Sequence, residues 1–348
     1  MRIKKQFAAS LFTSLWLACL LISPVHAAVK APIGAAVDPA ALVNVTNGIL
    51  VLEIENANTG FLGEWTVRTG ASHPNPGQLV LYPVGTSYIT FRDATALIMY
   101  ANTSGAAAGL AGYTFQNMST APGAGVVTNL ANGYRTVWTI PSWTITQDVT
   151  INGTTLSNTN VQQTVTVTNT SGAPRLYGLR FMWDWDIAGN DASFFRTRNP
   201  DGAFTSTFAT FPSPAFQLFE EVNNLTTPLF SVFGTVTGGP LVPAPTPPDQ
   251  LRYSSWSTAV GSAWDFSNTG GGVDSATEHY WGFNAPLTLA AGASATYTQY
   301  LTTNFQAGGG GGAPPGPIQV PTLSEWGVLL LIALLGGIAI WSVRRKLR

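Results

Sequence analysis

The densest group of oxygen-bearing side chains is the stretch DWDIAGNDAS, which contains Asp184, Asp186, Asn190 and Asp191. Hard oxygen donors on a turn that leaves a strand are the ligands that Ca²⁺ prefers. The spacing does not fit an EF-hand loop, however, and alternation along a strand by itself predicts that Asp184 and Asp186 face solvent. The solvent-facing interpretation is favoured, so no cofactor is expected, with Ca²⁺ at Asp184, Asp186 and Asp191 as the alternative.

A second stretch whose residues could bind or act on a ligand is ATEHYWGFN, which places Glu278 and His279 beside Tyr280 and Trp281. Aromatic rings next to carboxylates can stack on sugars and hydrogen-bond their hydroxyls, although aromatic residues at period two usually belong to a core. A glycosidase would need two carboxylates roughly 5–10 Å apart. The carboxylates available for such a pair are Glu220, Glu221, Asp265 and Glu278.

Signatures of other enzyme classes are missing from the sequence. The exported body holds only two histidines, His73 and His279, and the single cysteine, Cys19, lies in the N-terminal apolar run. There is no G-x-S-x-G or H-E-x-x-H motif, so neither a serine hydrolase nor a zinc site is expected. His73, within ASHPNPG, is predicted to be an exposed loop residue, and the protein is predicted not to be an enzyme.

The elements that would carry these residues have a periodicity of two. Alternating apolar residues predict strands at 49–55 and 161–168, a half-buried strand at 177–187 and a hairpin at 287–303. The Pro-rich stretch 239–248 is predicted to be a long surface loop or an interdomain link. The fold class is therefore all-β: an antiparallel β-sandwich, as one large sandwich or two in tandem.

The N-terminal residues have the pattern of a secretory signal. A basic start and a short apolar run end in SPVHAA, where Val25 and Ala27 meet the requirement for small residues at the cleavage site. Signal peptidase is expected to remove residues 1–27, leaving Ala28 first, with cleavage after Ala28 as the alternative. The exported body then spans 28–305.

The C-terminal residues predict a membrane anchor behind a linker. Residues 306–319 are rich in Gly and Pro and are expected to act as a tether. Residues 326–343 carry no charge and, as a helix, would span about 27 Å at 1.5 Å per residue. The tail 344–348, with Arg344, Arg345, Lys346 and Arg348, is expected to stay cytoplasmic.

The charge of the body restricts its partners. The whole chain has a formal net charge of −1, but between signal and tail nine basic residues face 16 acidic ones. Such an acidic body has no basic patch to neutralise phosphates, so nucleic-acid binding is not expected.

Between linker and anchor lies VPTLSEWG, residues 320–327, and this end of the chain resembles the IPTL-CTERM sorting domain. The family pattern is I-P-T-L-x-x-W-G, a membrane helix and an Arg-rich tail. The matching positions in this chain are Val320, Pro321, Thr322, Leu323, Trp326 and Gly327. The resemblance, which covers 320–348, implies sorting similar to that of PEP-CTERM proteins, with an exosortase-like transpeptidase as processing enzyme.

These patterns together predict an exported protein with a non-catalytic structural or interaction role. It is expected to begin as a precursor anchored in the inner membrane and to end at the cell surface or in the extracellular matrix, where extracellular polysaccharide is a candidate partner. The alternatives are a carbohydrate-binding module and a secreted polysaccharide-active enzyme. An exposed aromatic row in a groove would favour the former, and two facing carboxylates in a cleft the latter.

Overall fold

The computed structural model describes residues 42–303, except 57–59, 84–85, 104–105, 121–124 and 240. These residues belong to the compact unit Val37–Arg348. The signal peptide, the linker and the sorting tail predicted from the sequence lie outside the described residues. The described part is nearly all β, as predicted, with one short helix, α2 (Trp256–Gly261), among its strands.

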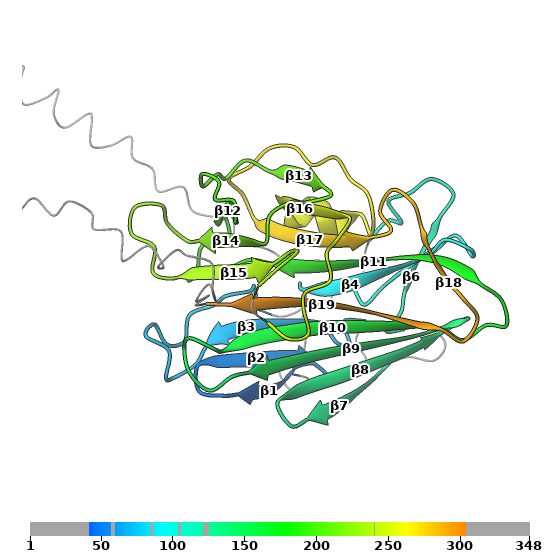
Figure 1. Ribbon diagram of the computed structural model, residues 1–348, viewed down its shortest axis with the longest axis horizontal. Coiled ribbons are helices and arrows are strands. Elements are labelled where there is room, and N and C mark those ends of the chain that lie inside the picture. The colour runs from blue at the N-terminus through cyan, green and yellow to red at the C-terminus, as the bar shows by residue number, and fades with distance from the viewer. Residues whose placement is uncertain are drawn as a thin grey trace, which may run out of the picture. The chain divides into compact units, whose positions relative to one another are not determined.

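The strands form three sheets (Figure 1). Sheet I contains β1 (Leu42–Thr46), β2 (Leu50–Glu55) and β3 (Trp65–Thr69) in that order. Sheet II has the order β12–β14–β15–β19–β10–β9–β8–β7, and its strands are Phe194–Arg198, Leu218–Val222, Ser231–Thr235, Ser294–Thr302, Asn160–Asn169, Trp143–Asn152, Gly133–Ile140 and Val126–Leu130. Sheet III has the order β13–β16–β17–β11–β4–β5–β6, and its strands are Ala209–Pro212, Gln250–Ser255, Ser275–Trp281, Arg175–Asp184, Tyr88–Asp93, Ile98–Ala101 and Thr114–Asn117, while β18 (Leu287–Leu289) pairs with β11.

The pairing is antiparallel apart from the parallel pair β5 and β6. Sheets II and III each take strands from both halves of the described chain, which crosses between them repeatedly. One crossing is the predicted loop at 239–248, which links β15 of sheet II to β16 of sheet III. Its prediction as a loop is confirmed for the described positions.

The inner faces of sheets II and III pack on each other and form the core. Phe91 of sheet III contacts Trp143 of sheet II edge to face, with ring centroids 4.9 Å apart. Such a pair adds about 0.5–1.5 kcal/mol beyond the area it buries. The predicted inward positions are confirmed: Leu50, Leu52, Ile54, Val161, Val165 and Val167 are all buried.

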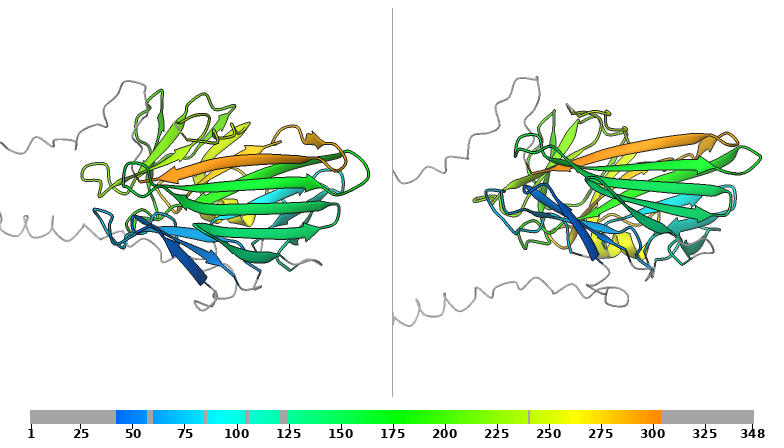
Figure 2. Two further views of the ribbon diagram at one scale, coloured as in Figure 1. Left: turned by 60° about the horizontal axis from the view of Figure 1, so that its bottom comes forward. Right: turned by 90° about the horizontal axis from the view of Figure 1, so that it is seen from below.

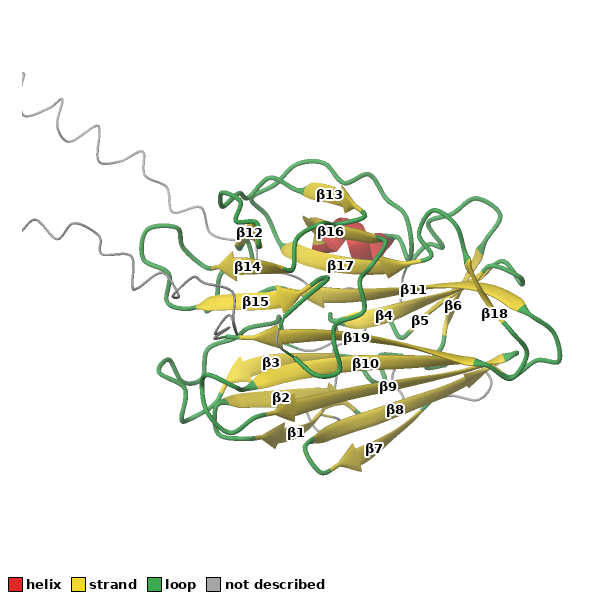
Figure 3. Ribbon diagram, viewed as in Figure 1, coloured by secondary structure: helices red, strands yellow, loops and turns green. Residues whose placement is uncertain are grey.

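The outer face of sheet III is covered, whereas that of sheet II is open along β9, most of β10 and the start of β19. Trp256 and Val260 of α2 pack on Tyr88 and Met182 of sheet III, and the helix lies against this sheet in Figure 3. Strand β11 is therefore buried on both faces from Tyr177 onward. The prediction that 177–187 is half-buried is wrong, because alternation along a strand cannot reveal what covers its second face.

The predicted hairpin at 287–303 is also wrong. Strand β18 pairs with β11, whereas β19 pairs with β10 and β15. Asn169, at the end of β10, donates from Nδ2 to the carbonyl oxygens of Leu289 and Ala290, at 3.0 and 3.1 Å. The intervening turn is thereby held at a corner where the chain passes from sheet III to sheet II.

Among residues 42–303, where described, no helix combines the length and the apolar character needed to cross a membrane.

Candidate functional site

Three carboxylates converge at the end of β11. One oxygen each of Asp184, Asp191 and Asp274 lies within 4.8 Å of the others. Asp184 is the last residue of β11, and Asp274 immediately precedes β17. The backbone N–H of Ser275 donates to the carbonyl oxygen of Asp191 at 2.7 Å, which holds the turn after β11 against the start of β17. The neighbouring strands therefore create this aspartate cluster.

The aspartate cluster differs from the sequence prediction in two respects. Asp186 is not part of it, and Asp274, which sequence reasoning missed, is. Asp184 and Asp186 have exposed fractions of 0% and 7%, so their interpretation as solvent-facing is wrong. No local motif points to Asp274, because only the pairing of β17 with β11 brings it near Asp184.

The chemistry of the aspartate cluster suits a hard cation. Ca²⁺ takes six to eight oxygen ligands, and three carboxylates would supply part of that set, with carbonyl groups and water needed for the rest. The nearby Glu64 is buried, and burial raises its pKa well above the ordinary value. The charges of Glu55 and Asp184 add to this shift. Calcium binding here stays a prediction.

The stretch ATEHYWGFN forms β17, and its side chains are divided between the two faces of sheet III. Tyr280 packs on the outer side against Trp264, whereas Phe181 and Trp281 meet in the inner core. His279 places Nε2 3.1 Å from the carbonyl oxygen of Thr235, and burial lowers its pKa to about 3. All four predicted binding residues are buried, so they form no exposed row on which a sugar could stack.

The carboxylates considered for a glycosidase pair each have structural partners. Glu220 accepts from Arg196 Nη2 at 2.6 Å, and Asp265 accepts from Arg252 Nη2 at 2.7 Å. Glu221 accepts a hydrogen bond from the Ser193 hydroxyl. Burial raises the pKa of Glu221 well above its usual value, as does, to a smaller extent, the charge of Glu278.

Solvent does not reach the two interacting members of this group. Glu221 and Glu278 both have an exposed fraction of 0%. A general acid or base must come within hydrogen-bonding distance of its substrate. In this conformation the two groups therefore cannot act on a glycan from outside.

His73 is buried rather than exposed, which corrects the sequence prediction. Its Nδ1 accepts from the backbone N–H of Asn75 at 3.0 Å, and Nε2 lies 3.1 Å from the Thr303 hydroxyl. The ring also packs edge to face on Phe230, and burial lowers the pKa of His73. It joins the loop after β3 to the end of β19.

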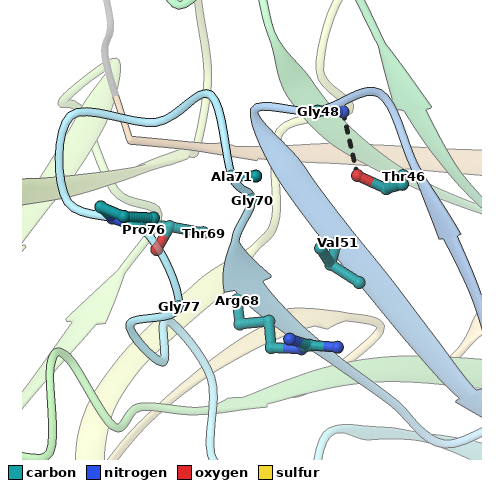
Figure 4. Close-up of a pocket in the computed structure, with 9 residues that line it drawn as sticks. All are labelled: Thr46, Gly48, Val51, Arg68, Thr69, Gly70, Ala71, Pro76 and Gly77. Atoms are coloured by element: carbon teal, nitrogen blue, oxygen red, sulfur yellow. Dashed lines mark hydrogen bonds between the residues drawn. The ribbon is translucent and has the colours of Figure 1, made fainter.

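A hollow of about 470 Å³ lies beside sheet I (Figure 4). Its lining residues are Thr46, Gly48, Val51, Arg68, Thr69, Gly70, Ala71, Pro76 and Gly77. Arg68, the charged residue of this set, forms an ion pair with Glu53 at 2.8 Å. Glu53 thus neutralises Arg68, and the lining of the hollow contains no carboxylate or histidine that could move a proton.

The comparisons with known proteins place a sorting signal at the C-terminal end. Residues 318–345 match the IPTL-CTERM motif, so the resemblance predicted from VPTLSEWG is confirmed. No curated protein sequence matches the chain.

Solved structures with a distant similarity to the chain exist. A protein from Synechocystis sp. PCC 6803 is 10% identical with a TM-score of 0.45, and the match covers 79% of this chain and 100% of that one. A galactose mutarotase-like protein from Lactobacillus casei ATCC 334 is 11% identical with a TM-score of 0.43, covering 75% and 99%. A galactose mutarotase related enzyme from Lactobacillus acidophilus is 11% identical with a TM-score of 0.39, covering 76% and 98%.

Proposed function

We propose that the protein is exported, processed at its C-terminal sorting signal and retained at the cell surface or in the extracellular matrix, where it acts without catalysis. The observation that carries this proposal is the IPTL-CTERM motif at 318–345. Within this end of the chain, VPTLSEWG follows a Gly/Pro-rich linker and precedes an apolar run and a basic tail, which is the order of a tethered body and its anchor.

The non-catalytic role is supported by the geometry of the body. The carboxylates considered for a glycosidase pair and the two histidines of the body are buried or in ion pairs, and the aromatic rings of β17 are buried. A protein whose contribution is a rigid β body on a tether needs no such groups at its surface. Calcium at the aspartate cluster would then stabilise the body.

Processing at VPTLSEWG assigns separate tasks to the residues of the tail. Pro321 would favour an extended segment, a form that a transpeptidase can bind. Trp326 favours the membrane interface and would fix the depth of the motif. The arginines and lysine after residue 343 would orient the helix through the positive-inside rule.

A tag placed after Arg348, together with an antibody against the body, tests processing. In a strain that has the processing enzyme, the wild-type protein should lose the tag and leave the inner membrane. Pro321→Ala and Trp326→Ala should keep the tag and stay membrane-bound, whereas Ser324→Ala, at an x position of the motif, should behave as wild type. Retention of the tag by the wild-type protein would defeat the proposal.

Export is tested independently at the other end. Intact-mass analysis should find a mature chain that begins at Ala28, and Ala27→Phe should block cleavage because the peptidase accepts only small residues there. Recovery of wild-type protein that begins at Met1 would contradict export through a cleaved signal.

A further inference from the structure

The outer face of sheet II carries a regular array of hydroxyl groups. The register places Thr144, Thr168 and Ser294 in one row across β9, β10 and β19, and Thr146, Thr166 and Thr296 in the next. We call these six residues the hydroxyl face. Because strands lie about 4.8 Å apart and alternate residues about 6.8 Å apart along a strand, the hydroxyl groups form a grid.

Hydrogen bonds within the grid fix four of its six hydroxyl groups in place. Thr166 Oγ1 lies 2.9 Å from Thr296 Oγ1, and Thr168 Oγ1 lies 2.8 Å from Ser294 Oγ. In each pair one hydroxyl donates to the other, so the second keeps its hydrogen for an outside acceptor, and lone pairs remain on both. The grid therefore presents preorganised donors and acceptors together.

The hydroxyl face is open within the described part of the chain. All six residues are partly or fully exposed, and Figure 2 shows β19 beside β10 and β9 at one face of the body. The six residues lie side by side on three adjacent strands, at the end of the sheet where β9 and β19 begin and β10 ends. A grid that extends over several strands suits an extended or particulate partner better than a single small molecule.

The charge and polarity of the hydroxyl face restrict the classes of partner that could bind it. The charged neighbours on this face, Arg135 and Asp148, neutralise each other through two hydrogen bonds of 2.7 Å. A polyanion would need unpaired basic residues. The core of a protein interface would need large apolar or aromatic side chains, which the six residues do not provide. An uncharged polymer that is itself rich in hydroxyl groups matches the face.

We propose that the hydroxyl face binds a neutral polysaccharide, using repeated hydroxyl–hydroxyl contacts along several sugar units. This inference rests on the exported location proposed above. Each contact alone is weak, but a regular polymer can engage both rows together, so that binding is multivalent. A single sugar should accordingly not compete.

Sedimentation with insoluble particles tests the proposal. The full-length protein in detergent is incubated with cellulose and with curdlan, two neutral glucans, and with calcium alginate gel as an acidic one. We expect binding to at least one neutral glucan and at least tenfold weaker binding by the triple variant Thr146→Val, Thr166→Val, Thr296→Val. Valine keeps the shape and the strand preference of threonine, so the fold should survive, and circular dichroism verifies this.

The matched control replaces three exposed threonines outside the face, Thr226, Thr227 and Thr288, by valine and should bind as wild type. Equal binding by the face variant and wild type would overturn the proposal, as would binding to alginate alone or to none of the particles. Inhibition of ice growth without binding to glucan would also overturn it, because the grid would then bind ordered water. The tag after Arg348 tests sorting separately, so the failure of one proposal is distinguishable from that of the other.

Discussion

The outer faces of sheets II and III differ in their exposure to solvent. On sheet II, strands β9 and β10 alternate between buried and half-exposed residues, and the outward positions are mostly threonine. On sheet III, the outward residues Arg180 and Glu278 are completely buried under α2 and the segment that follows it. The same period-two pattern thus produces a solvated surface in one sheet and a charged interior in the other.

The buried face shows how a short helix can be fixed over charged groups. Arg180 donates from Nη1 to the carbonyl oxygens of Ala259 and Ser262, at 3.4 and 3.1 Å, and from Nη2 to the Tyr88 hydroxyl at 3.0 Å. A cation at the carbonyl end of a helix satisfies groups that have no partner within the helix. The cover and the buried arginine therefore depend on each other.

Of the changes that test this comparison, replacing Arg180 should lower the free energy of unfolding the most. Arg180→Met keeps much of the volume but leaves two buried carbonyl groups and a buried hydroxyl without their donor. Loss of one member of a buried charged network costs about 3–5 kcal/mol. Urea unfolding at pH 7 measures the change in the free energy of unfolding. A loss below about 1 kcal/mol, as at an exposed ion pair, would show that α2 does not depend on Arg180.

The second largest expected effect is a dependence of folding stability on pH, which arises from Glu278. Burial raises its pKa to about 7, against hydrogen bonding from Ser254 and the charges of Arg180 and Arg252. The pKa of Glu278 is thus higher in the folded state, about 7, than in the unfolded state, about 4.5. Its contribution to the free energy of unfolding is therefore fully present below about pH 4.5 and is lost as the pH rises through 7. At about 1.4 kcal/mol for each pKa unit, the loss is on the order of 3 kcal/mol.

Glu278→Gln, which stays neutral, should remove this dependence. We expect the variant to be more stable than wild type at pH 8 and similar to it near pH 4.5, as measured by urea unfolding across that range. Asp201→Asn, at an exposed carboxyl, serves as the control and should leave the high-pH loss in place. Parallel pH profiles for wild type and Glu278→Gln would contradict a buried titrating carboxyl.

Calcium should give a smaller effect at the aspartate cluster. Added Ca²⁺ at 100 times its Kd would stabilise the folded state by about 2.7 kcal/mol, and EDTA should reverse this. Asp274→Asn should abolish the response, while Asp201→Asn should retain it. Differential scanning calorimetry measures the shift in melting temperature. Identical melting of the wild type with Ca²⁺ and with EDTA would show that the aspartate cluster does not bind calcium.

Sequence patterns predicted the fold where local chemistry decides it. Alternation identified the inward residues of β2 and β10, and turn-forming residues identified the loop at 239–248. The sorting motif was predictable because its meaning lies in contiguous residues. These features require no knowledge of what packs from elsewhere in the chain.

The rest depends on contacts between distant segments. The burial of Asp184, the inclusion of Asp274 in the aspartate cluster and the burial of His73 by Phe230 all arise from segments remote in sequence. The hydroxyl face had a visible signal, since alternate threonines occur in 144–150 and 164–168. Only the strand register shows that they align into rows.

The smallest effect belongs to the exposed pair of Arg135 and Asp148 on sheet II. Their side chains are 46% and 25% exposed, so water and salt screen the 2.7 Å contact. Arg135→Met should cost roughly 0.2–1 kcal/mol in urea unfolding at low ionic strength, and less in 1 M NaCl. The same arginine-to-methionine change is thus compared on an open and on a covered face. A cost above about 3 kcal/mol, the range of a buried charge, would show that the outer face of sheet II is covered after all, and the hydroxyl face would lose its access to polysaccharide.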